Sequence, residues 1–212
     1  MSALSLEIKG EIATLTFDQP DSKVNVLNTQ TMTELSQIIG QVREKGSSLK
    51  ALIITSAKSG IFIAGADIKE IEGITSPEEA IDKAEKGKLV LGDLARLDLM
   101  TCAAINGACL GGGLELTLAC KHRVATFSDK VKIGLPEVKL GILPGFGGTV
   151  RLPKIVGPTR ALDMILSGRI ISGKNAMKYG LVERLFPEKR LLEETESYVK
   201  GLLEGREKKK RK

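Results

Sequence analysis

Alternating hydrophobic and polar positions mark the first elements of the chain. Residues 4–10 (LSLEIKG) and 11–19 (EIATLTFDQ) alternate in this way and predict two antiparallel strands that turn at Gly10. After a short loop, apolar residues recur at helical spacing in TQTMTELSQIIGQVREKG, and Asn28 stands before them as a plausible N-cap. The chain therefore begins with a hairpin and an amphipathic helix.

The middle of the chain changes to short apolar runs. LKALIITSA predicts a buried strand, and we expect the following KSGIFIAGAD to be a loop. Asp67 can cap a short helix, and Ser76 with Glu79 forms a capping box before a longer helix towards Leu99. CAAIN predicts another buried strand, followed by a glycine run, an apolar helix and the strand HRVATF.

The last third alternates turns with shorter elements. VKIGLPE leads into a loop rich in Pro and Gly, and shorter helices and a strand follow in TRALDMILSG, GKNAMKYG and LVERLF. The charged end of the chain predicts an exposed helix. Strands that alternate with helices indicate an α/β fold with a largely parallel sheet.

Composition places the charge at one end of an ordinary globular chain. Of 212 residues, 42% are hydrophobic and 27% are charged, which suits one domain with a substantial core. The net charge is +6, and residues 206–212 (REKKKRK) carry six basic and one acidic side chain; subtracting their +5 leaves +1. Such a run is more often a solvated end than a contact for RNA, a membrane or an acidic partner.

Several classes of protein are disfavoured. Aromatic residues make up 3% of the chain and Trp is absent, which argues against stacking on nucleic-acid bases, so we expect no nucleic-acid partner. No secretory signal and no apolar run of transmembrane length is visible, so we expect no membrane span.

Cysteine and histidine give little support for a metal site. Cys102, Cys109 and Cys120 lack CxxC spacing and lie in apolar surroundings, which favours buried free thiols in a reducing compartment. His122 is the only histidine and cannot make a His-rich metal site. We expect His122 to have a structural or surface role, and no metal to be bound.

The glycine run GACLGGGLEL is the first candidate for chemistry. It lacks the G-x-G-x-x-G spacing of nucleotide-binding loops. Glycines before a helix let a ligand approach the backbone, where unpaired first-turn N–H groups can stabilise an oxyanion. Glu115 follows near the start of that helix. Tight helix packing with Glu115 on the surface explains the run equally well.

A second glutamate favours a catalytic interpretation. Glu137 lies in IGLPEVKLGILPGFGGT, a sharply turned loop with apolar neighbours that would raise the pKa of a carboxyl group. Two glutamates in one apolar pocket can divide the roles of acid and base. Such a pair suits addition of water across a double bond, or movement of a proton between two carbons.

A third segment could supply a further N–H donor. The turn Ala64–Gly65–Ala66 is small and sterically open, at the end of an apolar run and before the helix that Asp67 caps. The N–H of Ala66 could form the second half of an oxyanion hole. By itself, an ordinary strand-to-helix turn is the better explanation.

Together these segments resemble the crotonase, or enoyl-CoA hydratase/isomerase, family between residues 6 and 186. The resemblance is carried by IAGADIKEI, NGACLGGGLELTLAC, IGLPEVKLGILPGFGGTVRLP, ALDMILSGR and GLVERL. It is greatest to the N-terminal hydratase domain of the multifunctional fatty-acid β-oxidation enzyme α-subunit. The family implies a spiral of ββα units that binds a bent acyl-CoA.

The resemblance also implies residue roles. Glu115 and Glu137 match the paired catalytic acids, and Ala66 and Gly112 match the N–H donors to the thioester oxygen. The segments that line the CoA moiety correspond to Val26, Leu27, Ala64, Asp67, Ile68 and Lys69. The implied reaction is hydration of 2-trans-enoyl-CoA to 3-hydroxyacyl-CoA, with Δ3-Δ2 isomerisation second and no cofactor beyond the CoA of the substrate.

The resemblance further predicts the setting of the chain. We expect residues 1–187 to form the crotonase-like catalytic domain, without the family's C-terminal covering helices, and residues 188–212 to begin a connection to further modules. A fragment of a multifunctional enzyme is implied, oligomeric or in a complex with a thiolase subunit, in a bacterial cytoplasm or, as a mature form, a mitochondrion. Two other classes stay open, namely an acyl-CoA-binding module with little activity and an assembly or RNA-binding piece that uses the basic end.

Overall fold

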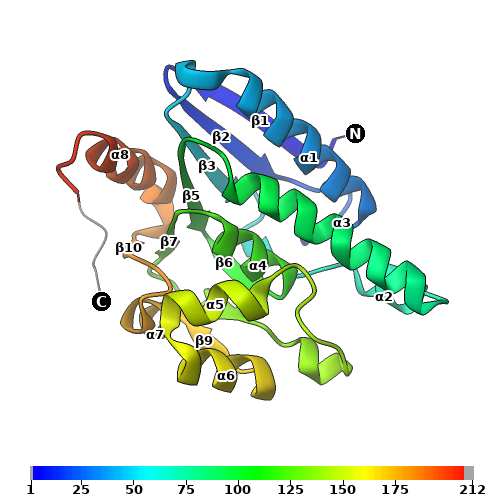
Figure 1. Ribbon diagram of the computed structural model, residues 1–212. Helices are drawn as coiled ribbons and strands as arrows, with labels where there is room; N and C mark the ends of the chain where they lie inside the picture. The colour runs from blue at the N-terminus through cyan, green and yellow to red at the C-terminus, as the bar shows by residue number, and fades with distance from the viewer. Residues whose placement is uncertain (1, 208–212) are drawn as a thin grey trace.

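Two sheets form the framework of residues 2–207, the part of the chain that this computed structural model describes (Figure 1). The larger sheet has the order β1 (Leu4–Lys9), β2 (Ile12–Phe17), β3 (Ala51–Ser56), β5 (Met100–Ile105), β7 (His122–Thr126) and β10 (Arg184–Phe186). The smaller sheet has the order β4 (Gly60–Ile63), β6 (Gly107–Leu110), β8 (Lys132–Gly134) and β9 (Ile170–Ser172). Most of the basic run, 208–212, lies outside the described residues, and its prediction as a solvated end is untested.

Eight α-helices accompany the sheets within the described residues. They are α1 (Thr29–Glu44), α2 (Ile68–Glu72), α3 (Pro77–Ala95), α4 (Gly112–Ala119), α5 (Gly148–Val156), α6 (Pro158–Ser167), α7 (Gly173–Tyr179) and α8 (Leu191–Leu203). Asn28, Asp67 and Ser76 cap α1, α2 and α3 as predicted, although Glu79 accepts from Thr75 and leaves the capping box half formed. None of these helices is both long and apolar enough to cross a membrane.

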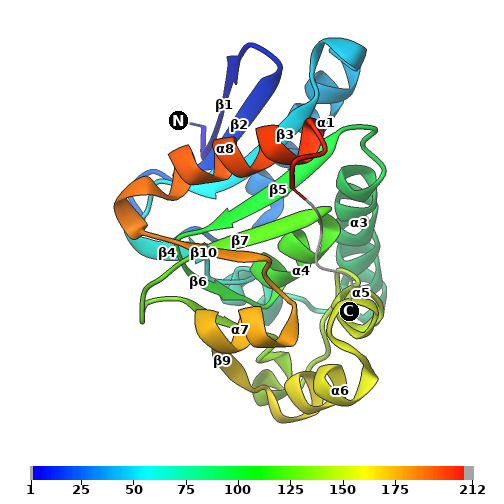
Figure 2. The ribbon, with the colours of Figure 1, turned by 90° about the vertical axis from the view of Figure 1, so that its left-hand side faces the viewer.

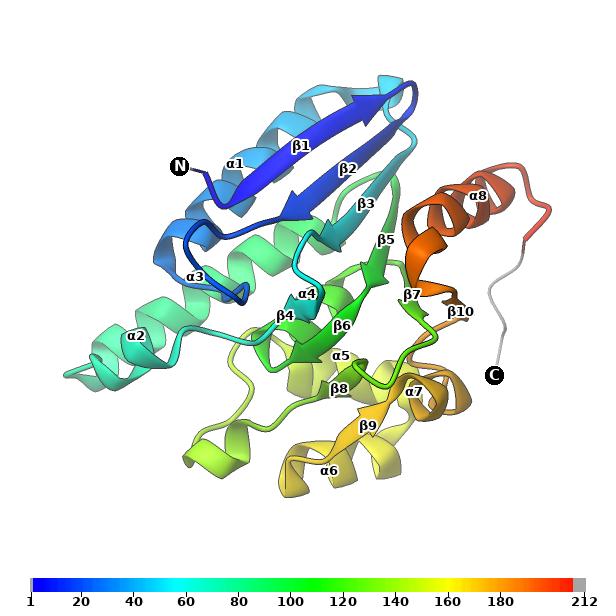
Figure 3. The same ribbon diagram turned by 180° about the vertical axis from the view of Figure 1, so that it is seen from behind.

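From β3 to β8, successive strands alternate between the two sheets. β3, β5 and β7 are parallel neighbours in the larger sheet, while the strands that follow each of them, β4, β6 and β8, are parallel neighbours in the smaller one. One or two helices follow each strand pair, so the chain advances as a spiral of ββα turns (Figure 3). The predicted α/β class, the largely parallel sheet and the β1–β2 hairpin are confirmed.

Two strands were not predicted. β4 lies inside the expected loop KSGIFIAGAD, and β6 lies at the start of the glycine run. The two strands pair with each other, and Phe62 and Ile63 of β4 are fully buried. Each strand has only four residues, too few for a periodic pattern, and what stabilises them is contact with each other across 40 or more residues of sequence.

The larger sheet is covered on both faces. Leu52 and Ile54 of β3 face the core shared with α1 and α3, whereas Ala51 and Ile53 face Tyr198 and other residues of α8. Figure 2 shows α8 crossing the strands on the side opposite α1 and α3. The prediction of an exposed C-terminal helix was therefore wrong. Apolar and small residues at 191, 195, 198 and 199 form a stripe on α8 that its many charges conceal in a linear reading.

The boundary predicted after residue 187 stays a prediction, as does the role of residues 188–212 as a connection to further modules. α8, however, packs with β3, β5 and β7 in a second hydrophobic cluster, on the face of the larger sheet opposite α1 and α3. It is therefore packed on the sheet formed by the preceding residues.

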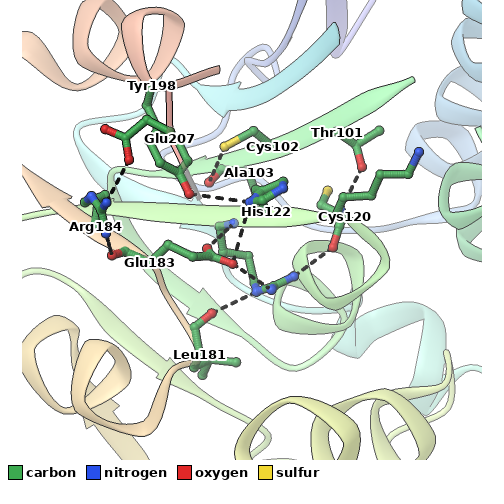
Figure 4. Close-up of polar contacts among 12 residues, drawn as sticks. Thr101, Cys102, Ala103, Cys120, His122, Leu181, Glu183, Arg184, Tyr198 and Glu207 are labelled. Carbon is green, nitrogen blue, oxygen red and sulfur yellow. Dashed lines mark hydrogen bonds and ion pairs between the residues drawn. The ribbon is translucent and has the colours of Figure 1, made fainter. Parts of the chain in front are cut away.

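A buried charged group lies beneath α8 (Figure 4). Arg123 is 1% exposed, and its guanidinium donates to Glu183 at 3.4 Å and to the Leu181 carbonyl at 2.8 Å. The other carboxylate oxygen of Glu183 accepts the Arg123 backbone N–H at 2.7 Å. Nδ1 of His122 lies 3.8 Å from Glu183 and 3.5 Å from the Tyr198 hydroxyl. His122 is therefore buried and part of the framework, which corrects the surface alternative.

Glu183→Ala is expected to lower the free energy of unfolding by about 3–5 kcal/mol, because it leaves the Arg123 guanidinium buried without its counter-charge. The matched control is Glu207→Ala, which removes a partly exposed partner of Arg184 and should cost less than about 1 kcal/mol. Urea unfolding followed by circular dichroism measures both. Equal losses in the two variants would contradict a structural role for the buried pair.

Candidate active site

The glycine run shapes the start of α4. Gly111 is the N-cap residue and adopts φ +51°, a backbone conformation that favours glycine. A Cβ atom at Gly113 would lie 2.4 Å from the carbonyl oxygen of Ile63, so α4 can approach β4 this closely only without a side chain there. The tight-packing explanation of the glycine run is therefore confirmed at Gly113, while access of a ligand to the helix start stays a prediction.

The turn at Gly65 lies against this helix start. A Cβ at Gly111 would be 3.7 Å from Cα of Gly65. Leu27 pairs with Ala66 in a parallel bridge, in which the N–H of Leu27 donates to Gly65 and the N–H of Asp67 donates to Leu27. This pattern turns the N–H of Ala66 away from Leu27. Within residues 2–207, neither Ala66 nor Gly112 donates its backbone N–H to another protein group.

Glu115 is buried at the same end of α4. Its side chain belongs to a residue that is 2% exposed, and Oε1 accepts hydrogen bonds from the N–H groups of Phe146 at 2.8 Å and Gly148 at 2.7 Å. Burial raises the pKa of Glu115 above its ordinary value, while these two N–H groups act in the opposite direction. The surface position weighed for Glu115 from the sequence is therefore wrong.

Glu137 approaches the site from the 3-10 turn Glu137–Leu140. Its Oε1 would lie 3.2 Å from a Cβ built at Gly111, and its buried Oε2 has no hydrogen-bond partner among the described residues. Burial, with a smaller contribution from the negative charge of Glu115, raises the pKa of Glu137 to about 7. Glu137 therefore lies beside the Gly111 turn that begins α4, the helix that carries Glu115. The pairing of Glu115 and Glu137 as catalytic acids stays a prediction.

The residues assigned to CoA form two adjoining segments. The first contains Val26 and Leu27, and the second runs from Ala64 to Lys69; the two are joined by the Leu27–Ala66 bridge and by the Ala64 N–H donating to Asn25. Leu27 is buried beside Gly112, whereas Ile68 and Lys69 are exposed. The carboxylate of Asp67 accepts from the N–H of Lys69 and serves as the N-cap of α2.

Phe146, Gly87 and Arg151 contribute to the site and were not identified from the sequence. The ring of Phe146 fills the space beside Gly112 and would lie 2.2 Å from a Cβ at Gly87 of α3. Arg151 donates from Nη1 to the Phe146 carbonyl at 2.7 Å. Gly87 and Phe146 are far apart in the sequence, so their contact produces no local sequence pattern from which it could be predicted. The only signal in the sequence was the dense turn PGFGG, which marks a fixed loop.

Groups that could bind metal are not gathered at this site. Within residues 2–207, no cluster of three or more His, Cys, Asp or Glu side chains has the arrangement that holds a metal ion. Cys102, Cys109 and Cys120 are buried, as predicted, and form no disulfide. What the site offers is two carboxyl groups of raised pKa and two backbone N–H donors, an arrangement suited to acid–base chemistry on a polarised carbonyl compound.

Comparison with known proteins agrees with this class of site. Residues 7–211 match the model of the enoyl-CoA hydratase/isomerase family. Because the match covers nearly the whole chain, the chain belongs to this family, the crotonase family. A crystal structure of an enoyl-CoA hydratase from Bacillus anthracis superposes with a TM-score of 0.88 at 33% identity, over 95% of this chain and 77% of that one. A structure from Geobacillus kaustophilus gives 0.89 at 33% identity, over 95% and 75%.

Two curated relatives, more similar in sequence than these solved structures, have the same name. A fatty acid oxidation complex subunit alpha from Vibrio campbellii is 43% identical over 208 residues, which are 97% of this chain and 29% of that protein. The protein of the same name from Shewanella frigidimarina is 47% identical over 182 residues, 86% of this chain and 26% of its own length. The chain therefore spans less than a third of the length of these relatives.

Glu137→Gln is expected to remove a pH-dependent loss of stability. Since the pKa of Glu137 is raised to about 7, its favourable contribution to folding is complete below the unfolded value near 4.5 and is lost as pH rises to about 7. Relative to wild type, the variant should gain on the order of 2 kcal/mol between pH 5 and pH 8, measured by urea unfolding. The exposed Glu11→Gln serves as control. If the variant instead lost stability relative to wild type as pH rises from 5 to 8, the raised pKa of Glu137 in the folded protein would be contradicted.

Proposed function

We propose that this chain adds water to a 2-trans-enoyl-CoA and releases a 3-hydroxyacyl-CoA. The observation that carries the proposal is that two buried glutamates, Glu115 within α4 and Glu137 beside its N-cap, lie near a helix start whose Gly112 N–H has no protein partner among the described residues. Glu137 lies against Gly111, Glu115 lies one turn into α4, and the negative charge of Glu115 contributes to the raised pKa of Glu137. Hydration of an α,β-unsaturated thioester uses all of these groups.

The N–H donors polarise the substrate. The thioester oxygen accepts hydrogen bonds from Ala66 and Gly112, whose N–H groups have no partner within the described residues. Negative charge develops on this oxygen as the enolate forms, so the donors stabilise the transition state more than the bound substrate. The bridge between Leu27 and Ala66 fixes one donor, and the start of α4 fixes the other.

The glutamates divide the proton transfers. Glu115, with Oε1 bound by two N–H groups, is the one better stabilised as a carboxylate, and it takes a proton from water as the oxygen attacks C3. Glu137, whose pKa is raised to about 7, is half protonated near neutral pH and delivers a proton to C2. The elements of water are thereby added across the C2–C3 bond, and acid–base groups alone suffice without a metal or redox cofactor.

The same pair can also move a double bond. A carboxylate that removes a proton from C2 of a 3-enoyl thioester, with return of a proton at C4, gives the 2-enoyl isomer through the same enolate. We propose this isomerisation as a second activity. From the names of the curated relatives, we further propose that the chain works as part of a fatty acid oxidation complex. The thiolase subunit and the bacterial cytoplasm that the family resemblance implies belong to the same proposal.

Glu115→Gln and Glu137→Gln are each expected to lower kcat by about 10²-fold or more, because each removes one proton-transfer group while nearly preserving side-chain volume. Loss of the conjugated thioester absorbance of crotonyl-CoA measures the rate. Glu11→Gln, exposed on the β1–β2 hairpin, is the control and should match wild type.

Binding measured alongside the rate separates the proposal from an acyl-CoA-binding module. If wild type and both glutamine variants bound acyl-CoA with similar affinity and were equally slow, the module would be the correct description. A third arm compares the chain with and without residues 206–212 for binding to RNA. Salt-sensitive binding that disappears with these residues would instead indicate an RNA-binding piece.

A further inference from the structure

The loop at 144–148 holds Glu115, but it has little regular structure of its own. Both N–H groups on Oε1 of Glu115 come from this loop, at Phe146 and Gly148. Between these two residues Gly147 adopts φ +100° as the N-cap of α5, and no side chain caps the helix start. The orientation of two N–H groups towards one oxygen therefore needs a further constraint.

Arg151 supplies this constraint from the first turn of α5. Its Nη1 donates to the carbonyl of Phe146 at 2.7 Å. A Cβ at Gly147 would lie 2.4 Å from the same nitrogen, so the guanidinium packs directly over the Gly147 backbone. Phe146 is thus held on both sides, with its N–H on Glu115 and its carbonyl on Arg151.

The aromatic ring of Phe146 anchors the loop on its other side. Because Gly87 has no side chain, the ring packs against α3, and it also contacts the position of Gly112 at 3.4 Å. Rotation of Phe146 would therefore disturb the Glu115 contact and the surroundings of the N–H donor at Gly112. Arg151 is the only side chain among the described residues that hydrogen-bonds the Phe146 carbonyl.

The positive charge of Arg151 also favours the carboxylate form of Glu115, in addition to the hydrogen bond by which Arg151 holds the loop. Two positive charges favour the carboxylate of Glu115, Arg151 of α5 and Lys88 of α3. The acidic neighbour is Glu137, whose own pKa is raised in part by the charge of Glu115. The influence of Arg151 on Glu115 is mutual, since Glu115 also favours the charged form of Arg151 against partial burial. Arg151 therefore supports Glu115 both by geometry and by charge.

We propose that Arg151 is a positioning residue for the hydration reaction, which fixes loop 144–148 so that Phe146 and Gly148 hold Glu115 in place as the base. The inference rests on the proposed function for its catalytic meaning. Arg151 touches neither Glu115 through a hydrogen bond nor the N–H donors themselves. It acts through the backbone of one loop.

Arg151→Met is expected to lower kcat on crotonyl-CoA by about 10²-fold with KM changed less than about threefold, because a displaced base affects chemistry more than substrate binding. Arg151→Lys keeps the charge and one donor and should recover part of the loss. Lys154→Met removes a positive charge from the exposed side of the same helix and should leave kcat unchanged. In a Glu115→Gln background, Arg151→Met should cause little further loss.

A direct titration makes the test independent of activity. The carboxyl ¹³C resonance of Glu115, observed in a Glu137→Gln background, should titrate at higher pH in Arg151→Met than in the parent and shift less in Arg151→Lys. If wild type hydrates no enoyl-CoA, the proposed function fails while the titration still decides the positioning role. If wild type is active but Arg151→Met matches Lys154→Met in both kcat and titration, the positioning role is overturned alone. Should Arg151→Met fail to fold, Arg151→Lys decides by the same comparison.

Discussion

The site depends on one carboxylate oxygen, Oε1 of Glu115, and the two backbone N–H groups that bind it. Burying a carboxylate is costly unless hydrogen bonds replace its water, and here both donors come from a loop more than 30 residues further along the chain. The same bonds therefore join α4 to the start of α5. They fix the side chain that the proposed chemistry needs and also hold the start of α5 against α4.

The spiral explains why distant segments converge. From β3 to β8, each ββα turn places its second strand in the smaller sheet. The residues that follow β4, β6 and β8 are respectively the Ala66 turn, the start of α4 and the loop with Glu137. Because β4, β6 and β8 are parallel neighbours, these three connections lie at the same edge of that sheet. Gly113 then permits the close approach of α4 to Ile63, and Gly111 that of the helix start to Gly65 and to the carboxyl group of Glu137.

Much of this arrangement was predictable and part of it was not. The capped helices, the hairpin and the parallel strands follow from local pattern. The pairing of Glu115 with Glu137 came from the family resemblance, and it stays a prediction. β4 and β6 are too short to show a hydrophobic period, and their pairing with each other stabilises them as strands. α8 was misjudged because its charges outnumber the few positions that pack on the sheet. Arg151 was missed because it acts on the backbone carbonyl of Phe146, and the direction in which a backbone carbonyl points cannot be read from a sequence.

Environment distinguishes two glutamates that are chemically identical. Glu115 is the more buried of the two, but its hydrogen bonds compensate in part for the loss of water. Glu137 is slightly more exposed, yet its Oε2 has no partner within the described residues and the negative charge of Glu115 is close, so the neutral form is favoured up to about pH 7. The proposed division into base and acid therefore arises from where backbone N–H groups are available. A loop of glycine and proline, held by Arg151, determines which of the two carboxyl groups receives them.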